Sequence, residues 1–181
     1  MEQNNIEQRL EDHGLYLSEK LGQHFLIDNE VIKLIADRVS IGAKVIEVGS
    51  GIGHVTEALS KQASSVIGIE IDKKFWPVLQ DIQDSDPKIK FIFKDALQVS
   101  FDSLVKRNVE TQIIANLPFH IVEPFFYKLI DLPITNAILM TGVRTAEELQ
   151  MNENNMGYGK MALLCQTFFD IKVIKDVHKH S

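Results

Sequence analysis

The chain has 181 residues, of which 45% are hydrophobic and 24% charged. This is the composition of an ordinary globular protein of one domain, and it excludes a disordered or fibrous chain. The longest apolar runs, such as 45–48, are far too short to cross a bilayer, and residues 1–10 lack the apolar segment of a signal peptide. We therefore expect a cytoplasmic protein with no membrane segment, in which the single Cys165 packs in the core.

The acidic charge limits the partners that the chain can bind alone. Its net charge is −6 at pH 7, with a pI of about 5.5. An acidic chain lacks the positive surface that usually accompanies tight binding to a phosphate backbone. A nucleic-acid substrate stays possible, because a local patch or a further domain can supply the positive charge.

Short apolar runs rich in β-branched residues alternate with amphipathic stretches. This alternation predicts an α/β fold with a mainly parallel sheet and helices on both faces. Parallel strands are buried on both faces, so they read as continuous apolar runs. The expected strands are Lys44–Gly49, Ser65–Glu70, Ile89–Phe93, Gln112–Asn116, Ala137–Thr141 and Asp170–Val177.

Four apolar stripes at helical spacing predict helices between these strands. The first precedes the first strand and is capped by Asp28 or Asn29. Residues 1–14 are predicted to be a frayed helix or an ordered lid, and residues 150–159 a polar loop. The stripes are Val31, Ile35 and Val39; Phe75, Leu79 and Ile82; Ile121, Phe125 and Leu129; and Met161, Leu164, Cys165 and Phe168.

The strongest motif is KVIEVGSGIG, residues 44–53, an apolar strand followed by three glycines at alternate positions and a helix that begins near His54. Gly49, Gly51 and Gly53 let the backbone approach a ligand closely. The following helix start offers amide groups to a carboxylate or phosphate. The motif predicts a nucleotide-like cofactor, and its GxGxG spacing differs from the GxGxxG pyrophosphate fingerprint.

Two acidic residues end the next two strands. Glu70 ends the second strand, where its side chain can accept hydrogen bonds from both hydroxyls of a ribose. Asp95 ends the third strand, where it can accept from an adenine amino group, while Ile71 and Ala96 sandwich the ring. A cap at a strand-to-helix turn is the structural alternative for Asp95.

The segment IIANLPF, residues 113–119, ends the fourth strand with groups suited to a planar amine. Asn116 offers a carbonyl oxygen, Pro118 fixes the backbone, and Phe119 offers an aromatic face. An exocyclic base nitrogen can donate to Asn116 while its ring stacks on Phe119. The combination predicts transfer of a group to a base nitrogen.

At these residues the sequence resembles the small-subunit ribosomal RNA adenine dimethyltransferases of the kasugamycin-resistance type. The resemblance covers residues 18–181, with all motifs in the family's order and spacing. It implies a Rossmann-like methyltransferase fold and methylation of adenine N6 in the RNA of the small ribosomal subunit. The motifs are LGQHFLID (21–28), EVGSGIGHVTEAL (47–59), VIGIEID (66–72), KDAL (94–97), NLPF (116–119) and YGKMALLCQ (158–166).

The resemblance also implies roles for individual residues. S-adenosylmethionine is the implied cofactor and S-adenosylhomocysteine the product, with no metal. Asn116, Leu117, Pro118 and Phe119 are the implied catalytic residues, and His24 stands where the family often has Asn. The implied cofactor contacts are His24 and Leu26, Gly49 and Gly51 at the methionine end, Glu70 at the ribose, Ile71, Asp95 and Ala96 at the adenine, and Asn116 near the methyl group.

The chain departs from the family in two places. Residues 141–149, TGVRTAEEL, replace the usual Gln-x-Glu segment of the RNA-facing surface. The family's last strand and helical C-terminal domain do not follow the sixth expected strand. We therefore expect a piece of a longer enzyme, with an N-terminal extension over 1–17 and a catalytic domain over 18–181. This monomeric piece should bind cofactor without efficient RNA methylation.

Three other interpretations stay open. Erythromycin-resistance relatives methylate large-subunit RNA and typically have Ile where Leu117 stands. Mitochondrial transcription factors resemble the same fold and act as binding proteins, although Asn116, Pro118 and Phe119 favour catalysis here. An NAD-dependent oxidoreductase shares the glycine loop and Glu70, but it leaves Asp95 and residues 116–119 unexplained.

Overall fold

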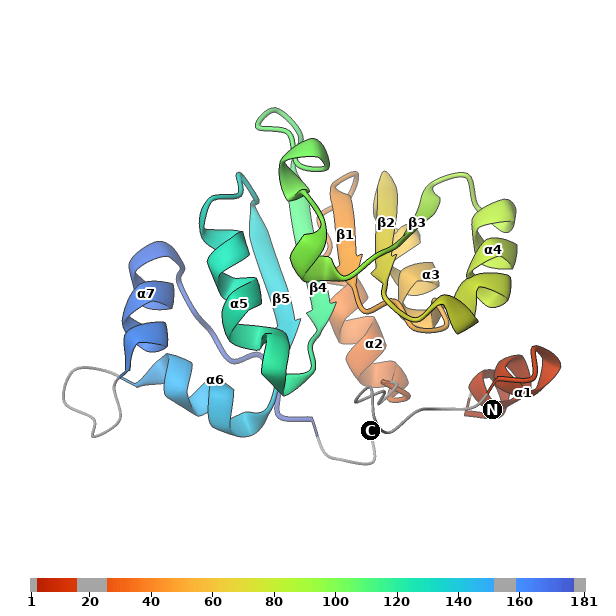
Figure 1. Cartoon of the computed structure of the whole chain (residues 1–181), viewed down its shortest axis with the longest axis horizontal. Coiled ribbons are helices and arrows are strands. Elements are labelled where there is room, and N and C mark those ends of the chain that lie inside the picture. The colour runs from red at the N-terminus through yellow and green to blue at the C-terminus, as the bar shows by residue number, and fades with distance from the viewer. Residues whose placement is uncertain (1–2, 16–25, 152–158, 178–181) are drawn as a thin grey trace.

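A computed structural model describes residues 3–15, 26–151 and 159–177. Five parallel strands form one sheet in the order β3-β2-β1-β4-β5 (Figure 1). The α/β fold with a parallel sheet is therefore confirmed. The strands are β1 (Lys44–Val48), β2 (Ser65–Glu70), β3 (Ile89–Phe93), β4 (Thr111–Asn116) and β5 (Asn136–Met140).

Helices cover the sheet in two groups, each with its own apolar core. One core joins α2, α3 and α4 to the sheet, and the other joins α5, α6 and α7 to it. No helix in the described ranges is long and apolar enough to span a membrane. The helices are α1 (Gln3–Asp12), α2 (Asn29–Ala36), α3 (His54–Ser60), α4 (Trp76–Ser85), α5 (Phe119–Ile130), α6 (Val143–Gln150) and α7 (Lys160–Phe168), with short 3₁₀ turns η2 (Lys73–Phe75), η3 (Ala96–Gln98) and η4 (Phe101–Ser103).

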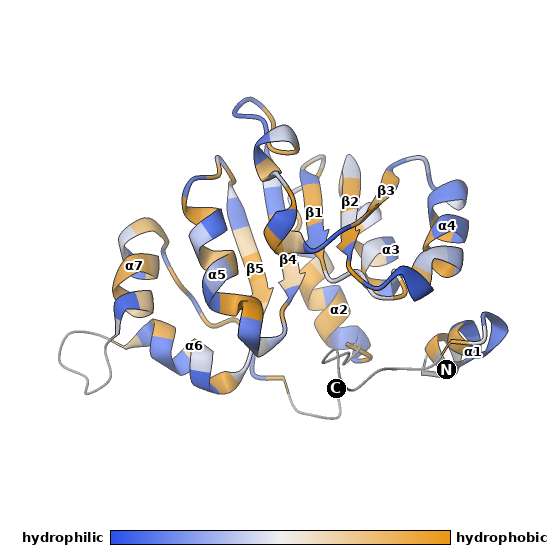
Figure 2. Cartoon of the chain, viewed as in Figure 1, coloured by the Kyte–Doolittle hydropathy of each residue, from blue (hydrophilic) through white to orange (hydrophobic). Residues whose placement is uncertain are grey.

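The central strands are buried because the two helical layers cover both of their faces. Val45, Ile46 and Ile113 are fully buried, as expected for strands with continuous apolar sequence. Figure 2 shows the contrast between these apolar strands and the more polar outer helix α4. The buried Gln112 is tolerated because its side chain accepts from the Ser40 amide at 2.8 Å and donates to the Arg38 carbonyl oxygen at 3.4 Å.

The five expected strands from 44 to 141 are confirmed, and β2 and β3 have the expected bounds. β1 stops one residue early, at Val48, and β4 starts one residue early, at Thr111. β5 covers Asn136–Met140 and is shifted by one residue at both ends. All four expected helices are present as α2, α4, α5 and α7, and Cys165 is buried in α7 as predicted.

The sixth expected strand, Asp170–Val177, is wrong. The segment has no regular secondary structure, and no described strand pairs with it. It passes along β5 from one core to the other, since Ile171 packs against one core and Val177 against the other. A β-branched sequence forms a strand only where a neighbour takes up its backbone hydrogen bonds, and this segment does not pair with the edge strand β5.

Two helices, α1 and α6, lie outside the four apolar stripes that predicted helices. Residues 3–12 form the helix α1. Residues 143–150 form α6, a helix that sequence analysis had not predicted. Leu149 of α6 is buried in the core that also holds Cys165. Most of the expected polar loop 150–159 lies outside the described residues.

Asp28 is the N-cap of α2, and it is one of the two residues expected for this position. The Asp28 carboxylate accepts from the amides of Glu30 at 2.8 Å and Val31 at 3.2 Å. We expect Asp28→Ala to lower the free energy of unfolding by about 1 kcal/mol, because two amides at the helix start lose their acceptor. Urea unfolding measures this, with Asp28→Asn as the control that keeps an acceptor. Equal losses in both variants would contradict the capping role.

Candidate functional site

The candidate site lies at the carboxyl ends of the strands, along the lower edge of the sheet in Figure 1. The strand order reverses between β1 and β4, since β2 and β3 lie on one side and β5 on the other. In open parallel sheets such a reversal leaves a crevice between the two outgoing loops, and ligands bind there. The loop after β1 and the segment after β4 flank this crevice.

The loop after β1 has the backbone shape that its glycines allow. Gly49 and Gly51 have φ values of +82° and +55°, which side chains other than glycine rarely adopt. The Gly49 amide donates to the carbonyl oxygen of Ile69 at 2.8 Å, which ties the loop to the end of β2. The expected tight glycine turn is therefore present.

Gly49 also brings the two halves of the site together. A Cβ atom at Gly49 would lie 3.2 Å from the backbone carbonyl oxygen of Asn116. This is tighter than most Cβ contacts, and the positive φ also favours glycine, so a side chain here would push the glycine loop and the end of β4 apart. The expected cofactor loop and the expected acceptor motif are thus neighbours.

Glu70 links the glycine loop to the end of β2. Its carboxylate accepts from the Gly51 amide at 2.7 Å, from Ile71 at 2.9 Å and from Asp72 at 2.8 Å. The side chain is buried, and burial raises its pKa although these three amides favour the charged form. Glu70 therefore joins the end of β2 to the glycine loop, with its carboxylate directed at the loop.

A second buried carboxyl group, Glu47 of β1, supports the same loop. Thr56 of α3 donates to it. Full burial, together with the nearby Glu70, raises the pKa of Glu47 to about 7, against the Thr56 hydrogen bond, which lowers it. Sequence analysis missed this residue, although a single acid inside the apolar run KVIEV was a usable signal.

The expected adenine residues lie at the ends of β2 and β3. Ile71 is 59% exposed, whereas Ala96 is buried in η3. Asp95 accepts from the Leu97 amide at 2.8 Å, so it caps η3 as the structural alternative proposed. The exposed Trp76 packs edge-on against Phe93, with ring centroids 5.0 Å apart, and widens the apolar surface here.

The acceptor motif connects β4 to α5. Asn116 ends β4 and is exposed, and Leu117 behind it is buried. The Leu117 amide donates to the carbonyl oxygen of Met140 at 3.1 Å, which holds the motif on the end of β5. Pro118 is the N-cap of α5, and Phe119 is the first residue of that helix. The motif thus spans the turn from the end of β4 to the first residue of α5.

Of the two residues expected from the segment 21–28, the structure describes one. Leu26 is buried, and its carbonyl oxygen accepts from Nε2 of His54 at 2.6 Å. Burial lowers the pKa of His54, so its neutral form is favoured. This contact places Leu26 beside the first turn of α3, next to the glycine loop. His24 lies outside the described residues.

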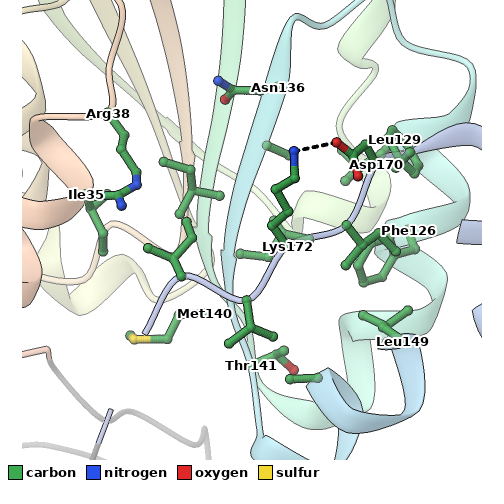
Figure 3. Close-up of a pocket in the computed structure, with 18 of the residues that line it drawn as sticks. Ile35, Arg38, Phe126, Leu129, Asn136, Met140, Thr141, Leu149, Asp170 and Lys172 are labelled. Atoms are coloured by element: carbon green, nitrogen blue, oxygen red, sulfur yellow. Dashed lines mark ion pairs between the residues drawn. The ribbon is translucent and has the colours of Figure 1, made fainter. Parts of the chain in front are cut away.

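A separate cavity of about 670 Å³ lies at the β5 edge, away from the glycine loop. Figure 3 shows Ile35 of α2 and Arg38, just after that helix, on one side and Leu129 of α5 on the other, with the segment 168–177 across the opening. Neither the loop 49–53 nor Glu70 lines it. The cavity results from the unpaired course of residues 170–177, and it is not the predicted site.

Comparison with solved structures identifies the class of fold. A dimethyladenosine transferase from Plasmodium falciparum superimposes with a TM-score of 0.68 over 79% of this chain and 52% of that chain, at 23% identity. The likeness concerns the fold, which is that of the Rossmann-like methyltransferases.

The family follows from sequence comparison. Residues 15–181 match the family model for ribosomal RNA adenine dimethylases, and the chain belongs to this family. It is 31% identical over 172 residues to ribosomal RNA small subunit methyltransferase A of Streptococcus thermophilus, covering 91% of this chain and 59% of the relative. The protein of the same name from Clostridioides difficile is 29% identical over 184 residues, covering 98% and 64%. The chain thus spans about six tenths of the length of these curated relatives.

The raised pKa of Glu47 predicts a pH dependence of stability. Between the ordinary glutamate pKa of 4.5 and the folded value of about 7, the folded protein keeps the proton while the unfolded chain loses it. Its contribution to the free energy of unfolding is complete below pH 4.5 and is lost as the pH rises through about 7.

We expect the urea midpoint of the protein to fall between pH 5 and pH 8. Glu47→Gln should fall less over this range, because the amide stays neutral and still accepts from Thr56. Glu70, whose pKa is also raised, leaves part of the slope in place. Glu11→Gln, at an exposed position of α1, is the control and should keep the full slope. An unchanged slope in Glu47→Gln would contradict the assignment.

Proposed function

We propose that the chain binds S-adenosylmethionine in the crevice between β1 and β4 and that it is the catalytic part of an enzyme that methylates adenine N6 in small-subunit ribosomal RNA. The observation that carries the proposal is the 3.2 Å approach of the Asn116 carbonyl oxygen to the Cβ position at Gly49. It brings a cofactor loop and an amine-binding motif to one crevice. The names of the relatives support the RNA and the reaction.

The residues at the crevice suit the cofactor. The positive φ values of Gly49 and Gly51 support a compact loop whose backbone can approach the methionine end closely. Glu70 is the proposed ribose ligand, either through further lone pairs of its oxygens or after turning from the Gly51 amide. Ile71 and Ala96 would contact the adenine ring, with Asp95 accepting from its amino group. Leu26 and His24 would close the methionine end.

When bound, S-adenosylmethionine supplies a sulfonium methyl group. Asn116 would accept a hydrogen bond from the target N6, and the backbone at Leu117 and Pro118 would stabilise the positive charge that develops there. Phe119 would stack on the base. This methyl group would pass to the nitrogen lone pair as its bond to sulfur breaks, and the nitrogen would then release a proton to water. Positioning supplies most of the rate in such a transfer.

The remaining expectations stay predictions. The acidic charge of the chain supports the view that tight RNA binding depends on residues of a longer protein. A cytoplasmic location fits a ribosomal substrate, and a monomer is the expected state. Among the alternatives, the family match favours a methyltransferase over an oxidoreductase.

Calorimetric titration with S-adenosylhomocysteine tests the cofactor site. We expect saturable binding, weakened about tenfold or more by Glu70→Ala, because hydrogen bonds to a charged group contribute most when buried. Glu30→Ala removes an exposed carboxylate on α2 and is the matched control. Circular dichroism verifies that each variant is folded. A folded parent that does not bind would contradict the proposed function.

Asn116→Ala separates transfer from binding. Under single-turnover conditions, with the chain in excess over small ribosomal subunits and a labelled methyl donor, we expect slow incorporation into adenine. The variant should reduce this rate by about a hundredfold or more, because a group aimed at the developing charge is lost. Its affinity for S-adenosylhomocysteine should change little. Asn136→Ala, at the opposite end of β5, is the control and should keep the parent rate.

Incorporation into large-subunit RNA in place of small-subunit RNA would contradict the proposed substrate and favour the erythromycin-resistance alternative. Cofactor binding with no incorporation into either RNA, even after long incubation, would favour a binding protein.

A further inference from the structure

The helix α1 lies beside the predicted cofactor loop, although residues 3–12 fall outside the stretch matched by the family model. Figure 1 shows it on the side where the strands end. Leu10 is buried in the core shared by α2, α3 and α4. His13, just after α1, reaches Asp81 of α4 at 3.3 Å and the Arg9 carbonyl oxygen at 2.9 Å. The helix is therefore attached to the domain at several points.

One side chain of α1 contacts the loop itself. Nη1 of Arg9 donates to the Glu57 carboxylate at 2.7 Å and, at a longer 3.4 Å, to the carbonyl oxygen of Ile52. Ile52 is the loop residue between Gly51 and Gly53, and Glu57 lies in the first turn of the helix that follows. Arg9 thus bridges the end of the loop and the start of α3.

The loop is consequently held from two sides at adjacent residues. The Gly51 amide donates to Glu70, and the Ile52 carbonyl accepts from Arg9. Glu70 lies 19 residues after Gly51, and Arg9 lies 43 residues before Ile52. Because the glycines themselves allow many backbone conformations, a fixed loop shape depends on such external contacts.

We propose that Arg9 is a positioning residue of the cofactor site, which holds the loop 49–53 in its binding conformation through Ile52 and Glu57. The proposal rests on the proposed function, because it assigns the loop to S-adenosylmethionine. A loop that is ordered before binding loses less conformational entropy when the ligand arrives. Loss of Arg9 therefore weakens cofactor binding without removing any group that touches the cofactor.

The ion pair is partly exposed, with side-chain exposures of 23% for Arg9 and 40% for Glu57. The expected effect is accordingly moderate. We expect Arg9→Gln to weaken the affinity for S-adenosylhomocysteine by about three- to tenfold, since exposed ion pairs contribute little and hydrogen bonds to charged groups contribute more. Glu57→Gln in the Arg9→Gln background should add little, because both changes remove the same contact.

The experiment combines calorimetry with hydrogen exchange of the peptide that covers residues 49–53. His13→Ala is the matched control, because it removes an anchor of α1 that does not touch the loop. We expect Arg9→Gln, but not His13→Ala, to speed exchange in the cofactor-free loop and to weaken binding. Arg9→Lys should have an intermediate effect, since an ammonium keeps the charge but not the planar donor group.

Three outcomes separate the positioning role of Arg9 from the assignment of the loop to S-adenosylmethionine. Equal effects of Arg9→Gln and His13→Ala would overturn the proposal, because Arg9 would then act only by attaching α1. Parent-like exchange and affinity in Arg9→Gln would also overturn it. A parent that fails to bind S-adenosylhomocysteine, while Arg9→Gln still speeds loop exchange, would support the positioning of the loop and refute its assignment to this cofactor.

Discussion

The hydrogen bond between the Glu70 carboxylate and the Gly51 amide is the contact on which the site depends. It joins the end of β2 to the loop after β1, so the crevice at the sheet's reversal has a defined wall. This hydrogen bond requires the Glu70 carboxylate to be buried, which is unfavourable for a charged group. Glu47 is a second buried carboxyl group in the same core. Burial raises the pKa of both carboxyl groups, and the nearby Glu70 adds to this effect at Glu47. Two buried acids are expected where the loop conformation that they stabilise contributes to function.

The opposite wall of the crevice depends on packing more than on charge. Leu117 is buried and bonded to the end of β5, so Asn116 is presented from a fixed backbone. Gly49 then lets the two walls approach. The sheet therefore positions both the expected cofactor groups and the expected acceptor groups, and residues from four different strands meet without a long loop. This is how a parallel sheet brings distant parts of a chain to one site.

Much of this arrangement could be predicted from the sequence because its signals are local. Continuous apolar runs indicated β1 to β5, and the glycines and Glu70 marked the loop where β1 ends. The strand predicted at 170–177 was wrong because strand formation depends on pairing with a neighbouring strand, which a sequence pattern does not reveal. Arg9 and Ile52 are 43 residues apart, and nothing in the local sequence of α1 indicates that they meet. Glu47 could have been found, since an acid inside a buried strand needs an explanation.

The central claim is that the cofactor lies between β1 and β4, and a crystal structure of the chain with S-adenosylhomocysteine bound tests it most directly. The account predicts the ribose at Glu70, the homocysteine part along Gly49 and Gly51, and the sulfur facing Asn116. A ligand bound instead in the cavity between α2 and β5, with the glycine loop empty, would contradict it.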